Sequence, residues 1–246
     1  MCKNKKLALV TGAAGVLGLE TTKRLTSEGY RVVMADLDGS LLKKLAAEVG
    51  SDAFPMKLDI SDPEKVRMAC NMISRDLDKV SVLVNNAGIL STNKTVETSP
   101  EEWRRILAVN LDGAFYLSRE LLPGMKLQRW GRIVNICSVA MKTGGLTAGT
   151  AYTTSKGGLA SLTFSLAREC ALYGVTVNGI APAYIRTPMV TEQLTEEQRQ
   201  KVISEIPVGR FCEAEEVAHV VSFLVSDLSG FITGEIIDIN GGLYMD

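Results

Sequence analysis

Tyr152 and Lys156 are the two side chains of this sequence best suited to moving a proton. They stand four residues apart at the start of a segment with helical apolar spacing, so a helix would place both on one face. A tyrosine with a pKa of about 10 carries protons poorly at neutral pH, but a neighbouring ammonium group stabilises the phenolate and lowers that pKa. Such a pair can protonate a carbonyl oxygen or deprotonate an alcohol. The alternative is that both are exposed surface side chains without a function, because this spacing is common by chance.

Ser138 directly follows the apolar run at residues 133–137. This run predicts a buried strand, so the serine hydroxyl would lie at the carboxyl end of a strand, where open α/β sheets bind ligands. There it could donate a hydrogen bond to a substrate oxygen. An ordinary turn serine is the alternative, and the later Tyr152 and Lys156 favour the functional interpretation.

A glycine-rich turn, TGAAGVLG at residues 11–18, follows the first apolar run. Gly12 and Gly15 allow a tight turn that brings backbone N–H groups close to a pyrophosphate, and the N-terminus of the following helix favours that charge. Such a turn can also be purely structural. Asp36 strengthens the binding interpretation, because it ends the second expected strand, where a carboxylate can accept hydrogen bonds from an adenosine ribose. A solvated loop aspartate or a helix N-cap is the alternative for Asp36.

Asp36 also indicates which dinucleotide would bind. A 2′-phosphate would meet its negative charge, and the next residue is Leu37 rather than Lys or Arg. The sequence therefore predicts NAD as the cofactor, in preference to NADP.

Short apolar runs alternate with amphipathic segments along the whole chain. Several runs are nearly continuous in Val, Ile and Leu, as in strands covered on both faces. We expect strands at residues 7–10, 31–35, 53–57, 82–84, 132–137, 176–180 and 236–239. We expect helices at residues 16–28, 40–49, 64–77, 101–122, 153–173 and 214–226. This alternation predicts an α/β fold, a doubly wound parallel sheet of Rossmann type with about seven strands and helices on both faces.

Composition and charge argue against several classes of protein. The 246 residues are 46% hydrophobic, which suffices for one large core, and we expect a single domain over residues 1–246. A net charge of -1 gives no reason to expect nucleic acid or an anionic membrane as partner. No apolar run is long enough to span a bilayer. The five scattered cysteines lack CxxC spacing, so we expect no metal, reduced thiols and a cytoplasmic location.

The polar stretch at residues 184–211 fits the strand–helix pattern least well. It is rich in Thr, Glu and Gln and contains Pro188 and Pro207. Such a stretch inside a compact fold is more often a functional lid than a spacer. We expect it to form a substrate pocket together with residues 90–93 and 139–151.

Together with further motifs, these features resemble the short-chain dehydrogenase/reductase family over essentially the whole chain. The resemblance is greatest to the branch of 3-oxoacyl-carrier-protein and acetoacetyl-CoA reductases. The matching motifs, in order, are the glycine turn, Asp59 in LDI, the segment NNAG with Asn86, Ala87 and Gly88, Asn110 in VNL, Ser138, Tyr152, Lys156, residues 182–187, and NGG at 240–242.

This resemblance implies a role for each matching residue. Tyr152 would transfer the proton while hydride passes between the nicotinamide and a substrate carbon, and Ser138 would hold the substrate oxygen. Lys156 would bind the nicotinamide ribose and lower the pKa of Tyr152, and Asn110 would position a water for proton relay. The implied cofactor contacts are Gly12, Gly15, Val16, Leu17, Asp36, Leu37, Asp59, Ile60, Asn86, Ala87, Gly88, Tyr152, Lys156, Pro182, Ile185 and Thr187.

The chain departs from the family pattern at three places. Val16 stands where TGxxxGxG has glycine, and the glycine is at Gly15 instead. Ala183 replaces the usual glycine after Pro182. The loop between Ser138 and Tyr152 is one residue longer than in the most similar relatives.

These features leave three functions open. The first is an NAD-linked oxidoreductase that interconverts a small secondary alcohol, polyol or hydroxy acid and its ketone. The alternative is a 3-oxoacyl-(acyl-carrier-protein) or acetoacetyl-CoA reductase. The third, a nucleotide-sensing protein without chemistry, is disfavoured by the complete set Asn110, Ser138, Tyr152 and Lys156.

We expect a small-molecule substrate rather than a carrier-linked one. Carrier proteins are strongly acidic and dock on basic patches, and Tyr173 stands where the related carrier-protein reductases have an arginine. The resemblance also implies a homotetramer. Residues 101–122 and 153–173 would form one interface, and residues 214–226 and 236–239 the other.

Overall fold

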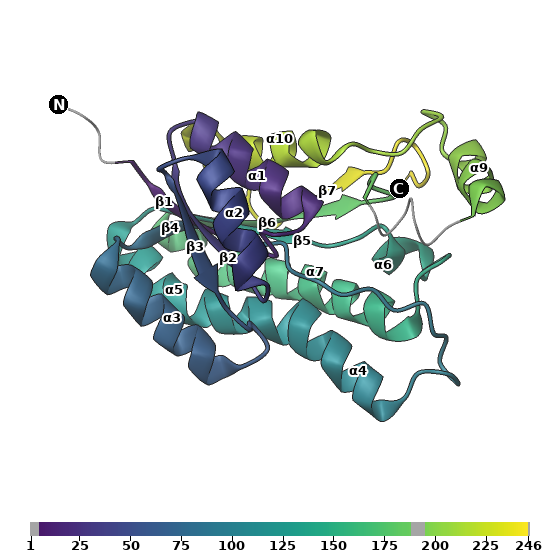
Figure 1. Ribbon diagram of the computed structural model, residues 1–246, viewed down its shortest axis with the longest axis horizontal. Coiled ribbons are helices and arrows are strands. Elements are labelled where there is room, and N and C mark those ends of the chain that lie inside the picture. Colours follow the sequence, from purple (N-terminus) through teal and green to yellow (C-terminus); the bar gives the residue numbers. More distant parts are fainter. Residues whose placement is uncertain (1–4, 188–194, 246) are drawn as a thin grey trace.

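A parallel sheet of seven strands forms the centre of the computed structural model, which describes residues 5–187 and 195–245 (Figure 1). The strands are β1 (Leu7–Thr11), β2 (Arg31–Asp36), β3 (Ala53–Lys57), β4 (Val80–Asn85), β5 (Gly131–Ile136), β6 (Val175–Pro182) and β7 (Ile236–Ile239). Their order is β3-β2-β1-β4-β5-β6-β7. The direction of winding reverses between β1 and β4, and ligands of open α/β sheets bind at the carboxyl ends of the strands beside such a reversal. The predicted Rossmann-type fold is confirmed.

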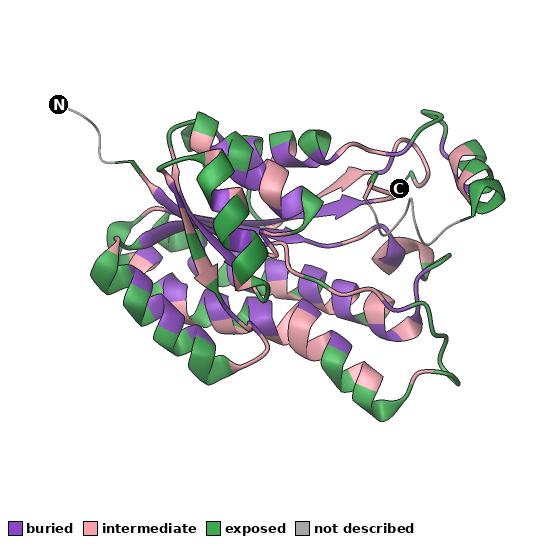
Figure 2. Cartoon of the chain, in the orientation of Figure 1, coloured by how far each residue is buried: buried purple, intermediate pink, exposed green. Residues whose placement is uncertain are grey.

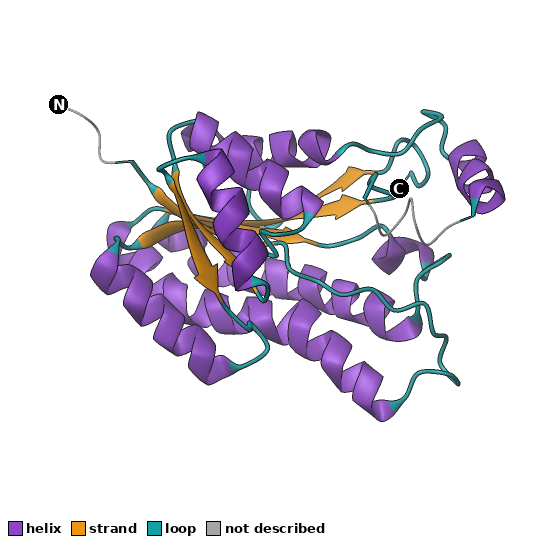
Figure 3. Ribbon diagram, in the orientation of Figure 1, coloured by secondary structure: helices purple, strands orange, loops and turns teal. Residues whose placement is uncertain are grey.

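Helices cover both faces of the sheet (Figures 1 and 3). On one face lie α1 (Val16–Ser27), α2 (Gly39–Val49) and α10 (Ala214–Val225). On the other lie α3 (Pro63–Asp76), α4 (Pro100–Leu107), α5 (Gly113–Gln128) and α7 (Thr150–Cys170). Shorter elements are α6 (Ala140–Thr143), α9 (Glu196–Glu205), and the turns η1 (Ala108–Asp112), η2 (Ala171–Tyr173) and η3 (Asp227–Ser229). None of the helices in the described ranges is long and apolar enough to cross a membrane.

The sheet separates two apolar cores, because successive residues of a strand point to opposite faces. In β1, Leu9 packs into the core beneath α3, α5 and α7, whereas Val10 packs into the core beneath α1, α2 and α10. Buried residues accordingly follow the sheet and the helix sides that face it (Figure 2). Burial on both faces explains why the strand sequences are nearly continuous in apolar residues.

Side-chain caps begin several of the helices. Asp38 accepts hydrogen bonds from the backbone N–H groups of Ser40 and Leu41 at the start of α2. Asp62 caps α3 in the same way, and Pro63 occupies the first position of that helix. Both arrangements satisfy N–H groups that have no partner inside the helix. These caps place the α2 and α3 boundaries within one residue of the predicted ones.

Two predicted segments differ from the structure. The helix expected over residues 101–122 is divided into α4 and α5 by the π-helical turn η1, which carries Asn110. The polar stretch at 184–211 contains the helix α9, begun by a capping box between Thr195 and Gln198. Residues 188–194 of that stretch, including Pro188, and Cys2 near the N-terminus lie outside the described residues.

The backbone contact between the glycine turn and α1 leads to a test of the fold. A Cβ atom on Gly18 would lie 2.2 Å from the carbonyl oxygen of Gly12 and 2.7 Å from the Cα of Ala13. We expect Gly18→Ala to lower the free energy of unfolding by about 2–3 kcal/mol, because backbone atoms cannot move aside cheaply. Chemical denaturation measures the change.

Gly124 in α5 provides the matched control for that substitution. Apart from its chain neighbours and the backbone of its own helix, no atom of the described residues lies within 4 Å of a Cβ built on it. Gly124→Ala should raise stability by up to about 1 kcal/mol, because alanine favours the helix. Equal effects of the two substitutions would contradict the role given to the Gly18 contact.

Candidate active site

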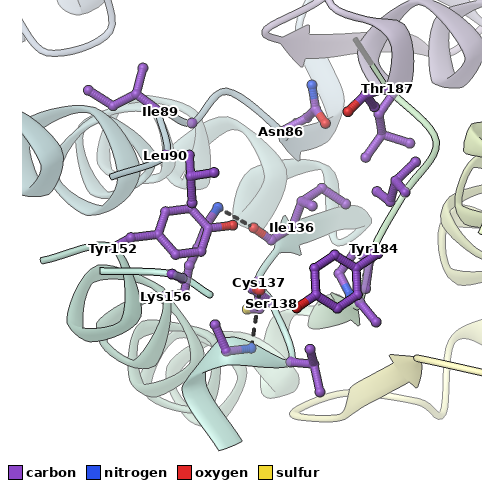
Figure 4. Close-up of a pocket in the computed structure, with 18 of the residues that line it drawn as sticks. Asn86, Ile89, Leu90, Ile136, Cys137, Ser138, Tyr152, Lys156, Tyr184 and Thr187 are labelled. Carbon is purple, nitrogen blue, oxygen red and sulfur yellow. Dashed lines mark hydrogen bonds between the residues drawn. The ribbon is translucent and has the colours of Figure 1, made fainter. Parts of the chain in front are cut away.

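A cavity of about 620 Å³ lies at the carboxyl ends of β1, β4, β5 and β6. The glycine turn and Asp36 line one end of it, and Ser138, Tyr152 and Lys156 line the other. Figure 4 shows these last three side chains together with residues from the segments that follow β4 and β6. One continuous cavity therefore holds both groups of residues that could do chemistry.

The glycine turn is braced against the segment that follows β4. Gly12 has a φ of 64°, and a Cβ atom there would lie 2.9 Å from the Cα of Ala87. The Asn86 side-chain amide donates to the carbonyl oxygens of Thr11, at 2.8 Å, and Gly12, at 3.2 Å. The Thr11 hydroxyl accepts the backbone N–H groups of Asn86 and Ala87 at 3.0 Å each. This bracing leaves the start of α1 open toward the cavity, as an anionic ligand group requires.

Asp36 lies at the end of β2 and lines the same part of the cavity. Its carboxylate accepts the backbone N–H of Ala14 at 3.1 Å and that of Asp38 at 3.2 Å. Within the described residues, no lysine or arginine forms an ion pair with it. The nucleotide end of the cavity thus carries a negative charge without a cationic partner.

At the catalytic end of the cavity, a side chain of α7 is hydrogen-bonded to the end of β5. Lys156 is 3% exposed, and its ammonium group donates to the carbonyl oxygen of Ile136 at 2.7 Å. It also lies 5.8 Å from the centre of the Tyr152 ring. Ser138 follows β5, and its hydroxyl accepts the backbone N–H of Ala140 at 3.2 Å. Tyr152 and Ser138 therefore face the same space from different elements (Figure 4).

Burial controls the titration of this end of the cavity. It lowers the pKa of Lys156 from 10.5 to about 8, because the charged form loses its hydration. Burial also raises the pKa of Tyr152, although a hydrogen bond with Ser138 acts in the opposite direction. The lowering of the Tyr152 pKa that we expected from Lys156 is therefore not found in the protein alone. Burial of the phenolate is the largest cause of the raised Tyr152 pKa, and the hydrogen bond with Ser138 offsets it only in part.

Asn110 lies behind the cavity wall rather than in it. It is 1% exposed, its carbonyl oxygen accepts the N–H of Ile89 at 2.8 Å, and its amide donates to the Ile89 carbonyl oxygen and the Ser155 hydroxyl, each at 3.0 Å. A Cβ on Gly88 would lie 3.4 Å from the Asn110 carbonyl oxygen and 3.3 Å from the Lys156 nitrogen. Asn110 and Lys156 thus approach the same glycine from one side. The π-helical turn η1 makes this possible, and such turns often occur at functional sites.

Comparison with known proteins gives full-length similarities. A family model described as enoyl-(acyl carrier protein) reductase matches residues 12–244. The 3-oxoacyl-(acyl-carrier-protein) reductase FabG of Haemophilus influenzae is 38% identical over 240 residues, 98% of each chain. FabG of Aquifex aeolicus is 40% identical over 243 residues, 97% of each chain.

Solved structures agree with these similarities. A short-chain dehydrogenase/reductase described as glucose/ribitol dehydrogenase, from Brucella melitensis, superposes with a TM-score of 0.91 at 33% identity, covering 99% of this chain and 98% of that one. The chain belongs to the short-chain dehydrogenase/reductase family. A putative gluconate dehydrogenase from Agrobacterium tumefaciens superposes with a TM-score of 0.93 at 31% identity, covering 97% and 95%.

Membership of this family makes the chain an oxidoreductase that acts on a hydroxyl or keto group with a nicotinamide cofactor. The residues present fit such a cofactor. Gly12, Gly15 and Gly18 line one end of the cavity without side chains that would cover the backbone of the turn, and the Asp36 carboxylate lines the same end. At the other end, the Lys156 ammonium group lines the cavity and has hydrogen-bond donors for the hydroxyl groups of a ribose. Among the described residues, no group of three or more His, Cys, Asp or Glu side chains is arranged to hold a metal.

The cavity brings together most of the residues predicted for this short-chain dehydrogenase/reductase. They are Gly12, Gly15, Val16, Leu17, Asp36, Asn86, Ala87, Gly88, Ser138, Tyr152, Lys156, Pro182, Ile185 and Thr187. Four predicted residues do not line it, namely Leu37, Asp59, Ile60 and Asn110. Leu37 is 61% exposed, and the Asp59 carboxylate accepts hydrogen bonds from the N–H and hydroxyl of Ser61. Asn110 lies behind the wall at the catalytic end, beside Ile89 and Gly88, and the cofactor contacts expected of Leu37, Asp59 and Ile60 stay predictions.

For the substrate end of the cavity, the sequence predicted which loops form the wall but not which of their residues line it. From the predicted ranges come Leu90, Thr92, Val139, Ala140, Thr143, Leu146, Thr147, Ala148 and Tyr184. Leu243, close to the C-terminus, was not predicted, because only the neighbouring NGG motif marks that region. Helix α9 does not line the cavity; it packs Val202 and Ile206 with Tyr184 and Leu243. The described part of the polar stretch therefore reaches the wall at its first residues, such as Tyr184, and a lid function stays a prediction.

The buried lysine leads to a prediction about pH. Between about pH 8 and 10.5 the folded protein holds Lys156 neutral, whereas the unfolded chain keeps it protonated. Unfolding then takes up a proton, so this group makes stability rise with pH in that window. Lys156→Met cannot titrate there. The stability of the wild type relative to Lys156→Met should increase by about 2 kcal/mol between about pH 7.5 and 10.

Urea denaturation of both proteins at each pH measures this difference, and other titrating groups cancel between them. A difference that stays constant or decreases with pH would show that the ammonium group is not desolvated in the folded protein.

Proposed function

We propose that this chain is an NAD(H)-dependent oxidoreductase that interconverts 3-oxoacyl and 3-hydroxyacyl thioesters. The observation that carries this proposal is the apolar wall beside Ser138 and Tyr152, on a chain whose full-length curated relatives are 3-oxoacyl-(acyl-carrier-protein) reductases. Leu90, Val139 and Leu146 can accommodate an acyl chain. The relatives support this thioester alternative better than the small free alcohol that the sequence analysis favoured.

The chemistry assigns a separate task to each side chain. A bound nicotinamide would supply or accept the hydride, and its oxidised form would add a positive charge that favours the phenolate of Tyr152. In reduction, Tyr152 gives its proton to the carbonyl oxygen while Ser138 donates a hydrogen bond to that oxygen. Lys156 holds the ribose and keeps a positive group beside the phenol. Asn110, behind Gly88, fixes the backbone of Ile89 and would position a water that relays protons.

A small free secondary alcohol or its ketone is the second candidate. The solved relatives named glucose/ribitol and gluconate dehydrogenase support it. Lys142 and Arg186, in the segments that carry the wall residues Thr143 and Ile185, are engaged in ion pairs, Lys142 with Asp238 at 2.6 Å and Arg186 with Glu213 at 2.8 Å. This arrangement gives little support for binding an anionic group at those positions.

Two further features remain proposals. The uncompensated carboxylate of Asp36 supports NAD over NADP. Exposed apolar side chains support association of copies into a tetramer. Phe115 on α5 is 44% exposed and Phe164 on α7 is 50% exposed, while Leu228 and Phe231 near β7 are almost fully exposed. Phe115 and Phe164 lie in the segments predicted for one interface, whereas Leu228 and Phe231 lie in the chain between the two segments predicted for the other.

The cofactor preference can be tested directly. We expect kcat/KM for NADH to exceed that for NADPH by at least about tenfold, because a 2′-phosphate would meet Asp36. Asp36→Ala combined with Leu37→Arg should narrow or invert this ratio, since it replaces the repulsive charge by an attractive one. Leu41→Arg, on the exposed side of α2, is the control for an added charge. Equal use of both cofactors by the wild type would refute the role of Asp36.

The substrate proposal is tested by steady-state rates. With NADH, acetoacetyl-CoA should be reduced with a kcat/KM at least about tenfold above that of any free ketone of similar length. A panel of secondary alcohols with NAD covers the second candidate. Tyr152→Phe should retain NADH binding, measured by fluorescence, and lose about 10²–10⁴-fold in turnover. If a free alcohol or ketone is preferred by a wide margin, the second candidate replaces the first.

A further inference from the structure

The turn at residues 145–148 forms part of the substrate wall, and none of its residues belongs to a helix or strand. Leu146, Thr147 and Ala148 line the cavity. The turn lies between α6, which follows Ser138, and α7, which begins just before Tyr152. Its position therefore determines both the shape of the pocket and the approach to the two reacting side chains.

Lys94, from the segment between β4 and α4, binds both ends of this turn. Its ammonium group donates to the carbonyl oxygen of Gly145 at 2.8 Å and to that of Ala148 at 2.7 Å. The two carbonyl groups flank Leu146 and Thr147, so the lysine connects the first and last residues of the turn. Charge-assisted hydrogen bonds of this kind are stronger than neutral ones.

Backbone contacts continue the same junction toward α7. The N–H of Gly149 donates to the carbonyl oxygen of Ser91 at 2.6 Å, and that of Thr150 donates to the carbonyl oxygen of Asn93 at 3.1 Å. A Cβ on Gly149 would lie 2.4 Å from the Asn93 oxygen, so the two backbones touch. The segment at residues 91–94 and the turn thus meet at close range.

Glu102 on α4 fixes the other side of this segment. Its carboxylate accepts the Asn93 side-chain amide at 2.8 Å and the Ser91 hydroxyl. Both hydrogen bonds lower the pKa of Glu102, because they favour its charged form. Lys94 is therefore presented to the turn from a segment that is itself anchored to a helix.

The turn reaches the opposite wall of the pocket through Thr147. The Thr147 hydroxyl and the Tyr184 hydroxyl lie 3.0 Å apart. The Tyr184 ring packs at 6.3 Å from the ring of Phe211, in the cluster that includes Val202 and Ile206. In Figure 4, Tyr184 points into the cavity on the side of Ser138. Any displacement of the turn would break the contact between Thr147 and Tyr184, in the same cavity as Ser138 and Tyr152.

We propose that Lys94 is a positioning residue that sets the shape of the substrate pocket by holding the turn at residues 145–148. The proposal rests on the cavity being the active site, but not on the identity of the substrate. A lysine that only stabilised the fold would affect cofactor binding and global stability as much as substrate binding. A positioning residue would act on the substrate alone.

The test compares Lys94→Met with Lys94→Arg. Methionine keeps the apolar stem and removes the donors, whereas arginine retains donors for both carbonyl groups. Lys44→Met, at an exposed lysine on α2, is the matched control. Rates are measured with acetoacetyl-CoA and also with whichever free alcohol or ketone the wild type uses best. If the wild type does not reduce the thioester, the proposed function fails while the Lys94 comparison is still made.

For Lys94→Met we expect the KM of the substrate to rise at least about tenfold, with kcat within about threefold and the dissociation constant of NADH within about twofold. Lys94→Arg should recover most of the loss, and Lys44→Met should resemble the wild type. Thr147→Val, which removes only the hydroxyl that contacts Tyr184, should raise the KM in the same direction by a smaller factor.

Hydrogen exchange supplies a readout that needs no substrate. The amides of Gly149 and Thr150 should exchange at least about tenfold faster in Lys94→Met than in Lys94→Arg, while β5 amides remain unchanged. Faster exchange across β5, or an equal weakening of NADH binding, would mean a general structural role and would overturn the proposal. So would a KM and a local exchange rate within about twofold of those of Lys44→Met.

Discussion

The hydrogen bond from the Lys156 ammonium group to the Ile136 carbonyl oxygen is the interaction on which the active site depends. It links α7, which carries Tyr152, to the end of β5, which leads into Ser138. A buried ammonium group is costly, and removing its hydrogen-bond partners would cost more. The protein tolerates this cost at the carboxyl edge of the sheet, where a positive group beside a phenol is chemically useful. The Lys156 nitrogen and the Asn110 carbonyl oxygen both lie close to Gly88, so the segment after β4 is placed by the same constraint.

The two ends of the cavity are built in different ways. The nucleotide end consists of turns that directly follow β1, β2 and β4, and their backbones contact one another, as in the approach of Gly12 to Ala87. The substrate end consists of segments that contact through side chains, such as Thr147 with Tyr184. Backbone contacts tolerate little change, whereas side-chain walls can vary on the same fold. This difference explains why membership of the family identifies the reaction more narrowly than the substrate.

Titration at the catalytic end depends on the ligand as well as the protein. Burial raises the pKa of Tyr152 and lowers that of Lys156. When no other charge is bound nearby, Tyr152 is therefore a neutral phenol, and Lys156 loses its proton more readily than a lysine in water. Oxidation of an alcohol needs the phenolate, whereas reduction of a ketone needs the phenol. The protein by itself therefore favours the form of Tyr152 that reduction requires. A cationic nicotinamide shifts this balance toward the form that oxidation requires.

The sequence by itself determined the sheet, most helix boundaries and most of the cofactor end. Apolar runs such as residues 7–10 report burial on two faces, and the glycine turn and Asp36 are adjacent to strand ends, so local pattern locates them. Only the tertiary structure decided the division of α4 from α5 at Asn110, the contribution of Leu243 to the wall, and the contact of Lys94 with Gly145 and Ala148. It also reversed the expected direction of the Tyr152 pKa. These features depend on distances between segments far apart in the chain and on the water that their packing excludes, and neither quantity has a local signature in the sequence.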